Sequence, residues 1–147
     1  MQKVFLLLFA WIPVTSICDF GNDPVKPDEP VNIEFLAAED LGCQEERSTV
    51  ENSLSLDYEL ATDGTLNLHL GFLSNCCSKY IHTVDVMSYI ITITLKDDAD
   101  EYCRCVCPWR QTYSFKTENL QSFRVKFYLQ EQFMLEPQLV LDKSFEL

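Results

Sequence analysis

Apolar and polar side chains alternate along much of this chain, and no other feature restricts its fold more. Between residues 54 and 60 every second residue is apolar and those between are polar, which is the period of a strand with one buried face. The same alternation resumes over residues 66–72, after an Asp63–Gly64 pair. Because Asp-Gly is a strong turn signal between two such runs, residues 54–72 are predicted to form a β-hairpin.

Further segments of strand character follow at short intervals, and no stretch has the period of a helix. They lie at residues 31–35, 80–87, 89–95, 102–107, 113–115, 123–129 and 135–147. Pro137 confines the last one to a sheet edge or to the start of a strand. The turn before Phe123 is similar to the one that enters the penultimate strand of fibronectin-type domains. The sequence therefore predicts an all-β fold, an antiparallel immunoglobulin/fibronectin-like β-sandwich of about eight strands over residues 31–147.

Residues 1–17 have the composition of a secretory signal peptide. Lys3 precedes an apolar run over residues 4–14, and this run is shorter than the roughly 20 residues that span a bilayer. Two cleavage sites compete, one after Ser16, where small residues suit an ordinary signal peptidase, and one before Cys18. Either site predicts an exported protein.

Cys18 stands where bacterial lipoproteins carry the cysteine that receives the lipid, although Ile17 differs from the small residue that usually precedes it. Residues 18–30 are acidic and rich in proline, which is typical of an extended, solvated tether. Setting Cys18 aside also leaves an even number of cysteines. We therefore expect a lipid anchor on Cys18 that attaches the protein to a membrane of the cell envelope, as in an outer-membrane lipoprotein. A soluble secreted protein is the alternative.

The acidic balance of the chain excludes several classes of function. It has 11 Lys and Arg against 23 Asp and Glu, a net charge of −12, and so lacks the basic footprint that binds nucleic acid or anionic lipid. The 4 glycines are too scattered to form a phosphate-cradling loop. No nucleophile motif for acyl transfer is present. We expect no cofactor and no enzymatic activity, and the negative charge favours a monomer.

The cysteines of the predicted domain permit three interpretations. They are Cys43, Cys76, Cys77, Cys103, Cys105 and Cys107. A shared metal ion requires sulfur atoms within roughly 4 Å of each other, whereas Cys103 and Cys107 would lie about 13 Å apart on a strand. A redox centre requires exposed thiols beside positive charge, and only Arg104 and Arg110 supply that charge here. No metal site is predicted on this basis.

Disulfide bonds suit an exported chain best. Cys76 and Cys77 are not expected to bridge to each other, because adjacent residues would close a strained ring. If each cysteine of the 103–107 segment pairs with one of Cys43, Cys76 and Cys77, a minority of the possible connectivities remains open. Polar residues on both sides of Cys76 and Cys77 indicate a loop, from which both side chains can reach across.

Three other candidates have a structural interpretation that we favour over a functional one. Trp109 and Tyr113 could form an exposed aromatic platform, but packing in the core is the stronger interpretation. His69 lies on the strand face opposite the leucines and is expected at the surface. The acidic run over residues 97–101 is interpreted as a solvated turn, because it lacks the ligand spacing of an EF-hand.

The order of the cysteines resembles a known pattern. Asn75-Cys76-Cys77 is followed by an ITIT run over residues 91–94, then by the segment CRCVCPW over residues 103–109. This arrangement is similar to the NCC…CxCxC pattern of uncharacterised cysteine-rich cell-envelope lipoproteins of Bacteroidetes, although Pro108-Trp109-Arg110 departs from the aromatic and Asp that tend to follow it there. The resemblance covers residues 66–128, about half of the chain. It implies a cell-envelope lipoprotein and no catalytic residue.

The combined prediction is an exported, lipid-anchored protein with a disulfide-stabilised β-sandwich. A signal peptide at 1–17 and a tether at 18–30 precede a single domain at 31–147. Its expected role is non-catalytic, either binding a protein or glycan partner or joining a surface assembly. The alternative is a thiol-based metal-binding or redox protein that uses Cys76, Cys77, Cys103, Cys105 and Cys107.

Overall fold

Eight β-strands form the part of the chain that the computed structural model describes, residues 31–43 and 54–147. The strands are β1 (Asn32–Cys43), β2 (Leu54–Leu60), β3 (Thr65–Asn75), β4 (Tyr80–Met87), β5 (Ile90–Asp97), β6 (Val106–Glu118), β7 (Ser122–Gln130) and β8 (Gln138–Glu146). None of these residues belongs to a helix that could cross a membrane. The predicted signal peptide, tether, cleavage sites and Cys18 all lie outside the described residues.

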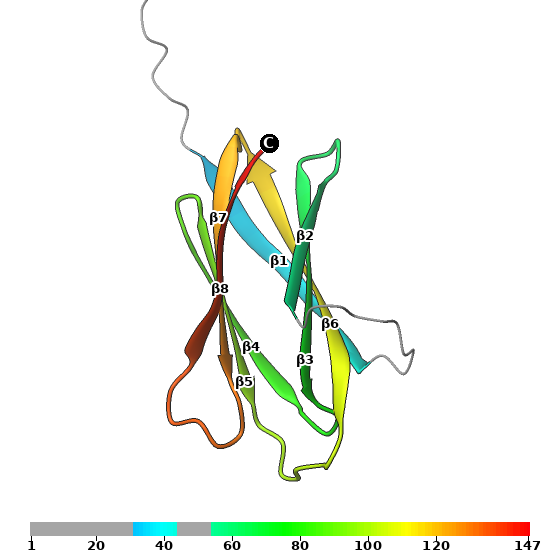
Figure 1. Ribbon diagram of the computed structural model, residues 1–147. Helices are drawn as coiled ribbons and strands as arrows, with labels where there is room; N and C mark the ends of the chain where they lie inside the picture. Colours follow the sequence, from blue (N-terminus) through cyan, green and yellow to red (C-terminus); the bar gives the residue numbers. More distant parts are fainter. Residues whose placement is uncertain (1–30, 44–53) are drawn as a thin grey trace, which may run out of the picture.

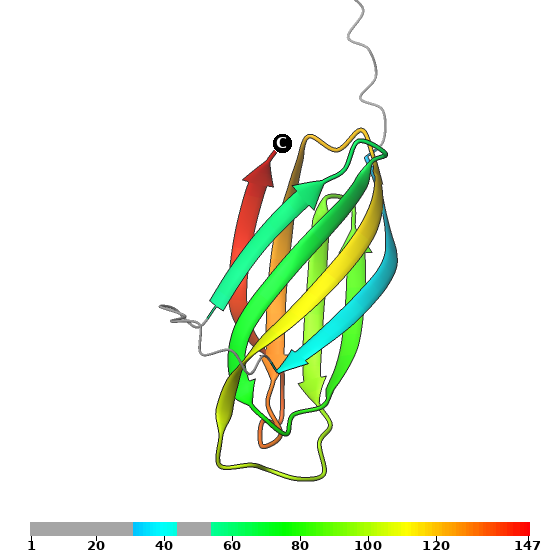
Figure 2. The same cartoon turned by 90° about the vertical axis from the view of Figure 1, so that its right-hand side faces the viewer.

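The strands form two four-stranded sheets that pack against each other (Figure 1, Figure 2). One sheet has the order β1-β6-β3-β2, and the other has the order β4-β5-β7-β8. Every neighbouring pair is antiparallel except β5 and β7, which run parallel. The predicted all-β sandwich of about eight strands is confirmed. In an immunoglobulin domain the first strand pairs with the second, whereas β1 pairs with β6 here.

The hairpin predicted from the alternating pattern is confirmed. β2 and β3 pair in an unbroken register from Leu54 opposite Phe72 to Leu60 opposite Leu66. In the turn, the backbone N–H of Thr65 donates a hydrogen bond of 2.9 Å to the Asp63 carboxylate. Gly64 has a φ of +82°, and a Cβ there would lie 2.8 Å from the Thr117 carbonyl oxygen. Only glycine meets both demands without strain.

The core lies between the sheets and is built from every second residue of the central strands. It is rich in aromatic side chains, which contact one another across the two layers. Phe72 of β3 packs against Tyr80 of β4 and Phe127 of β7, with ring centroids 5.5 and 5.6 Å apart. Tyr80 meets Trp109 of β6 edge to face, with centroids 5.1 Å apart. Such contacts stabilise the packing beyond the burial of apolar area itself.

Two sequence-based expectations concern strand limits. Pro137 was expected to confine the last strand to an edge or a strand start. β8 begins directly after it, at the edge of its sheet, which confirms this. The expectation of a strand over residues 102–107 is wrong for residues 102–105, which belong to the 98–105 loop, and right for Val106 and Cys107, which begin β6. Side-chain hydrogen bonds in this loop, described below, replace a strand ladder.

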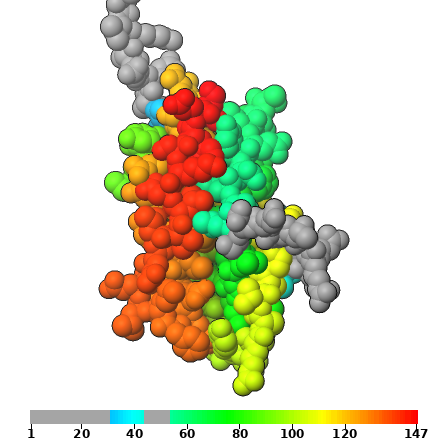
Figure 3. Space-filling view, in the orientation of Figure 1, coloured from blue at the N-terminus to red at the C-terminus, as the bar shows by residue number. Residues whose placement is uncertain are grey.

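The two ends of the sandwich differ in character (Figure 1). One end carries the β3–β4 turn, the 98–105 loop and the 131–137 loop, and β1 runs toward it to finish at Cys43. We call these segments the cysteine pole. The opposite end carries the β2–β3 and β4–β5 turns together with the start of β1. In Figure 3 the 98–105 and 131–137 loops, yellow to orange, lie at the lower end of the molecule.

Candidate functional site

Three disulfide bonds join the segments of the cysteine pole. Cys43–Cys107 links the end of β1 to β6, while Cys76–Cys105 and Cys77–Cys103 link the β3–β4 turn to the 98–105 loop. The Cα atoms of the pairs lie 5.8, 5.6 and 5.6 Å apart, which is the usual span of a disulfide. The prediction of a disulfide framework is confirmed. Each cysteine of the 103–107 segment pairs with one of Cys43, Cys76 and Cys77, as expected.

The placement of these cysteines differs in part from the expectation. Cys103, Cys105 and Cys107 were expected on one face of a strand, but only Cys107 belongs to β6. Cys103 and Cys105 lie in the preceding loop. The expectation for Cys76 and Cys77 is confirmed, because both follow β3 in a turn and both reach across to the loop.

The register of β3 against β6 accounts for one of these pairings. Ser74 lies opposite Cys107 and Asn75 opposite Val106, so an extension of this ladder by one residue brings Cys76 opposite Cys105. The backbone N–H of Cys76 donates a hydrogen bond of 3.2 Å to the Cys105 carbonyl. The Cys76–Cys105 bridge therefore closes the ladder where its regular hydrogen bonds end.

Asn75 is the residue that organises the loop. The sequence places it in the NCC pattern but indicates no structural role for it. Its amide nitrogen donates to the carbonyl oxygens of Cys103 and, at 3.3 Å, Cys105. Its amide oxygen accepts hydrogen bonds from the backbone N–H groups of Cys77 (3.0 Å) and Cys103 (3.2 Å). The bond to Cys77 is an Asx-turn. An Asn directly before two cysteines is the one signal in the sequence that could have identified it.

Asp97 fixes the base of the same loop. This side chain is buried and accepts hydrogen bonds from the Ser78 hydroxyl (2.8 Å), the Lys79 N–H (3.0 Å) and the Ala99 N–H (3.1 Å). The solvated turn expected over residues 97–101 is therefore wrong for its first member, because protein donors replace water around Asp97.

Trp109 and Tyr113 belong to the core, as predicted, and form no exposed platform. They are 6% and 0% exposed. The Trp109 indole N–H donates a hydrogen bond of 3.0 Å to the Asn75 carbonyl oxygen. Trp109 thereby anchors the end of β3, and with it the turn that carries Cys76 and Cys77.

A cleft of about 180 Å³ opens at the cysteine pole. Its lining combines the apolar residues Leu73, Tyr102, Val106 and Phe133 with the polar residues Ser74, Asn75, Asp97, Glu131 and Gln132. We call it the apolar cleft after the first group. Tyr102 and Phe133 are 61% and 78% exposed, and their ring centroids lie 5.6 Å apart. The Gln132 side chain donates a hydrogen bond of 2.8 Å to the Ala99 carbonyl oxygen. That bond connects the 98–105 loop, which carries Tyr102, to the 131–137 loop, which carries Phe133. The two rings therefore project from loops that are bonded to each other.

The segments that form the apolar cleft carry several exposed charged residues, and acidic ones are in excess. The acidic residues of the neighbouring segments are Asp98, Asp100, Glu101, Glu131 and Glu136, against Lys79, Lys96 and Arg104. Lys96 lies 4.0 Å from Asp98. Among the described ion pairs, this is the one that involves an acidic residue of these segments. The segments around the apolar cleft, which form its rim, therefore carry a net negative charge, as the whole chain does.

A second cleft, of about 300 Å³, lies on the β1-β6-β3-β2 sheet. His69, Asp57 and Arg110 are among its lining residues. His69 is exposed, as predicted, and its Nδ1 lies 3.2 Å from the Thr112 hydroxyl oxygen. A Cβ at Gly71 would lie 2.6 Å from the Ser55 hydroxyl, so the missing side chain shapes this cleft. Gln111 also lines this cleft; it is 1% exposed, and neither atom of its side-chain amide has a hydrogen-bond partner among the described residues.

His82 and Tyr113 form a further polar contact in the interior. Nδ1 of the His82 ring lies 3.1 Å from the Tyr113 hydroxyl. Burial lowers the pKa of His82, and the negative charge of Asp40 partly opposes this effect. Burial also raises the pKa of Tyr113, and Asp40 adds to the increase. Both groups are thus held in their neutral forms.

No protein-family model matches this sequence, and no curated protein or solved structure matches it significantly. The resemblance to lipoproteins with an NCC…CxCxC pattern therefore rests on the residues that carry it, Asn75 and the cysteines. Among the described residues, the feature that distinguishes this sandwich is the cysteine pole with its three bridges and exposed apolar cleft.

Proposed function

We propose that this chain is an exported, lipid-anchored cell-envelope protein that binds a protein partner, without catalysing a reaction, through the apolar cleft at its cysteine pole. The observation that carries the proposal is the exposed pair Tyr102 and Phe133, on two loops braced by disulfides and by the Gln132–Ala99 hydrogen bond. Disulfides form and persist in oxidising compartments, which supports export.

Exposed aromatic side chains on a braced loop are suited to binding. Aromatic residues are enriched at interfaces, because they bury a large area and lose little rotamer entropy. A loop that is already ordered also avoids much of the entropy cost of association. The bridges Cys76–Cys105 and Cys77–Cys103 restrain the 98–105 loop in this way.

The charge around the apolar cleft indicates the chemistry of the partner. A rim of carboxylates favours a segment that places apolar side chains in the cleft and Lys or Arg outside it. The proposed partner is thus a peptide segment that combines aromatic or aliphatic residues with flanking basic residues. Attraction to exposed carboxylates weakens as salt screens them, so the affinity should fall with ionic strength.

The direction of the strands suits a membrane anchor on the amino-terminal side. β1 starts at the end of the sandwich opposite the cysteine pole (Figure 1). A tether over residues 18–30 would therefore join the domain at the far end from the apolar cleft. A lipid on Cys18 would leave the cleft pointing away from the membrane, where a partner can reach it.

Selection of a random phage-displayed peptide library on the purified domain tests the binding proposal. We expect enriched peptides to combine aromatic or aliphatic residues with Lys or Arg. Their affinity should fall at least about tenfold for a Tyr102→Ser, Phe133→Ser double variant, the loss typical of removing interface anchors. Met87→Ser is the matched control, since Met87 is 75% exposed but lies in the β4–β5 hairpin at the opposite end. Equal affinity for the wild type and the double variant would refute the proposal.

Fractionation of cells that express the full chain tests the anchor. We expect the wild type in the membrane fraction and Cys18→Ala in the soluble fraction, because the lipid is attached through the Cys18 sulfur. A wild-type protein that is already soluble would contradict the lipid anchor. That result would leave the binding proposal standing, since the apolar cleft does not depend on Cys18.

A further inference from the structure

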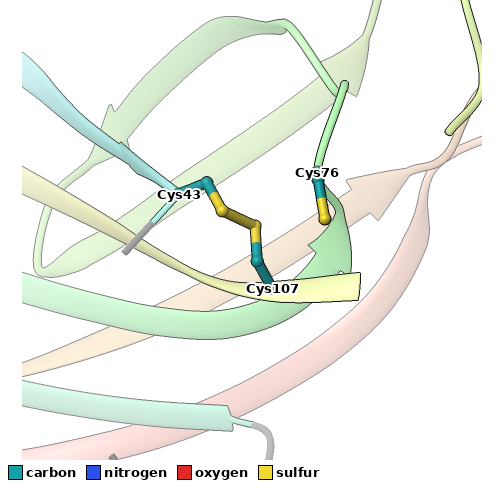
Figure 4. A group of neighbouring side chains, drawn as sticks. All are labelled: Cys43, Cys76 and Cys107. Atoms are coloured by element: carbon teal, nitrogen blue, oxygen red, sulfur yellow. A yellow bond between two sulfur atoms is a disulfide. The ribbon is translucent and has the colours of Figure 1, made fainter. Parts of the chain in front are cut away.

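Two of the three bridges lie so close together that their sulfur atoms form one group. The Sγ atoms of Cys43, Cys76 and Cys107 all lie within 4.8 Å of one another. Cys43 and Cys107 are bonded to each other, whereas Cys76 is bonded to Cys105. Figure 4 shows the Cys76 sulfur beside the Cys43–Cys107 bridge.

We propose that this sulfur group is a thiol–disulfide exchange site. The thiolate of a partner attacks Cys105, and a second exchange within the group then releases Cys43 as a free thiol. The co-reactant is a thiolate, from a protein cysteine or a small thiol. This site differs from the redox interpretation of the sequence, because Cys43 takes part and Cys77 and Cys103 do not. It needs no partner bound at the apolar cleft, although its first step opens one of the two bridges that restrain the 98–105 loop.

The first step uses the difference in exposure among the cysteine residues. Cys105 is exposed, Cys76 is half-buried, and Cys107 is only 7% exposed, so Cys105 is the accessible end of its bridge. The incoming thiolate forms a bond to the Cys105 sulfur, and the Cys76–Cys105 bond breaks. Its electron pair remains on Cys76 as a thiolate. One disulfide replaces another, so no net oxidation or reduction occurs.

In the second step the Cys76 thiolate attacks the neighbouring bridge. A bond forms to the Cys107 sulfur, the Cys43–Cys107 bond breaks, and Cys43 leaves as a thiolate that takes up a proton from water. Attack at Cys43 instead would release the thiolate on buried Cys107, where burial disfavours the charged form. Half-buried Cys43 is therefore the better leaving group.

The product differs from the starting structure at the end of β1. Cys43–Cys107 connects positions separated by 64 residues in the sequence and is the one bridge among the three that involves β1. After exchange the end of β1 keeps its ladder with β6 but has lost its covalent link to it. The reaction of a thiolate at the exposed loop thereby removes the covalent link of an edge strand, β1.

The variant Cys105→Ser isolates the second step, because it leaves Cys76 as a free thiol without any partner. The folded variant is alkylated with N-ethylmaleimide at neutral pH and its linked peptides are mapped. We expect a Cys76–Cys107 peptide and labelled Cys43. The matched control is Cys103→Ser, which frees Cys77, a residue outside the sulfur group. Labelling of Cys43 should be at least about tenfold higher in Cys105→Ser than in this control. Label on Cys76 alone, with Cys43–Cys107 intact, would overturn the proposal.

The wild-type protein gives a second test that does not depend on how the variant folds. A limiting amount of a dithiol reductant is added to the native protein, which is then alkylated and mapped. The dithiol closes to its cyclic disulfide and delivers its two electrons to the protein. We expect the first species with two free thiols to carry label on Cys105 and Cys43. Label on Cys105 and Cys76 instead would show that the exchange stops at the first bridge and would refute the site.

Discussion

At the scale of single residues, the cysteine pole depends on Asn75 as much as on its sulfur atoms. Both ends of this amide bind the backbone of the cysteine segments. The sequence indicates which residue types can bridge, since an exported chain favours disulfides. The choice among the open pairings could not be predicted, because it depends on the register of β3 against β6 and on the Asn75 hydrogen bonds. Neither is a property of local sequence.

Asn75→Ala is expected to destabilise the domain by about 2–4 kcal/mol, because backbone groups of Cys77, Cys103 and Cys105 lose their hydrogen-bond partner. Equilibrium unfolding in urea with intact disulfides measures this change. Asn67→Ala is the control, since that amide oxygen accepts one hydrogen bond of 2.7 Å from Ser114, and about 1 kcal/mol is expected. Equal losses for the two variants would contradict the role given to Asn75.

Burial of His82 makes the free energy of unfolding decrease as the pH falls. Because burial lowers its pKa below the ordinary value of 6.5, the unfolded chain binds more protons than the folded one near that pH. The free energy of unfolding therefore decreases as the pH falls through about 6.5 and below. His82→Gln should lose less stability than the wild type between about pH 7 and about pH 5. The exposed His69→Gln variant is the control, and an unchanged pH dependence in His82→Gln would refute the assignment.

At the scale of elements, strand character was predictable where hydrophobic alternation and turn chemistry agree. The β2–β3 hairpin has both, and its register follows the pattern residue for residue. The 102–107 segment was mispredicted, because apolar and cysteine residues alternate there just as on a strand. The side chain of Asn75, distant in sequence, binds the backbone of this segment instead. The nearby Asp97 side chain binds the backbone N–H of Ala99, just before the segment. Strand order, including the parallel β5–β7 pair, could not be predicted from local patterns.

Gly64→Ala is expected to destabilise the hairpin by more than about 2 kcal/mol, because the positive φ and the approach of the Thr117 carbonyl both oppose a Cβ. Gly42→Ala tests the effect of the positive φ alone, without a close contact of the Cβ. Gly42 has a φ of +69°, but a Cβ there would meet no atom within 4 Å, so a loss of about 1 kcal/mol is expected. Thermal unfolding of the two variants measures the difference. A smaller effect at Gly64 than at Gly42 would contradict this account.

At the scale of the whole molecule, the sandwich has one end that carries turns and the start of β1 and another that carries bridged loops and the apolar cleft. The core is built from residues of the described strands. The charge of −12 predicts, from composition alone, that the partner is not a nucleic acid. The apolar cleft could not be predicted, because Tyr102 and Phe133 are far apart in the sequence and meet only through loop packing.

Removal of residues 19–30 is expected to leave the stability nearly unchanged, because their acidic, proline-rich composition is typical of a solvated tether. Proteins comprising residues 19–147 and 31–147 are compared by thermal unfolding under non-reducing conditions. A difference in Tm below about 4 °C corresponds to less than about 1 kcal/mol for a domain of this size. A larger decrease would show that the proposed tether contributes to the fold.

The cysteine pole is the centre of this account, and disulfide mapping of the protein produced in an oxidising compartment tests it most directly. The mass of the intact, non-reduced protein should lie about 6 Da below that of the reduced protein, at roughly 2 Da for each bridge. Digestion without reduction should yield the linked pairs Cys43–Cys107, Cys76–Cys105 and Cys77–Cys103. Free thiols that hold a metal ion in the native mass spectrum, or any other set of pairs, would contradict the account.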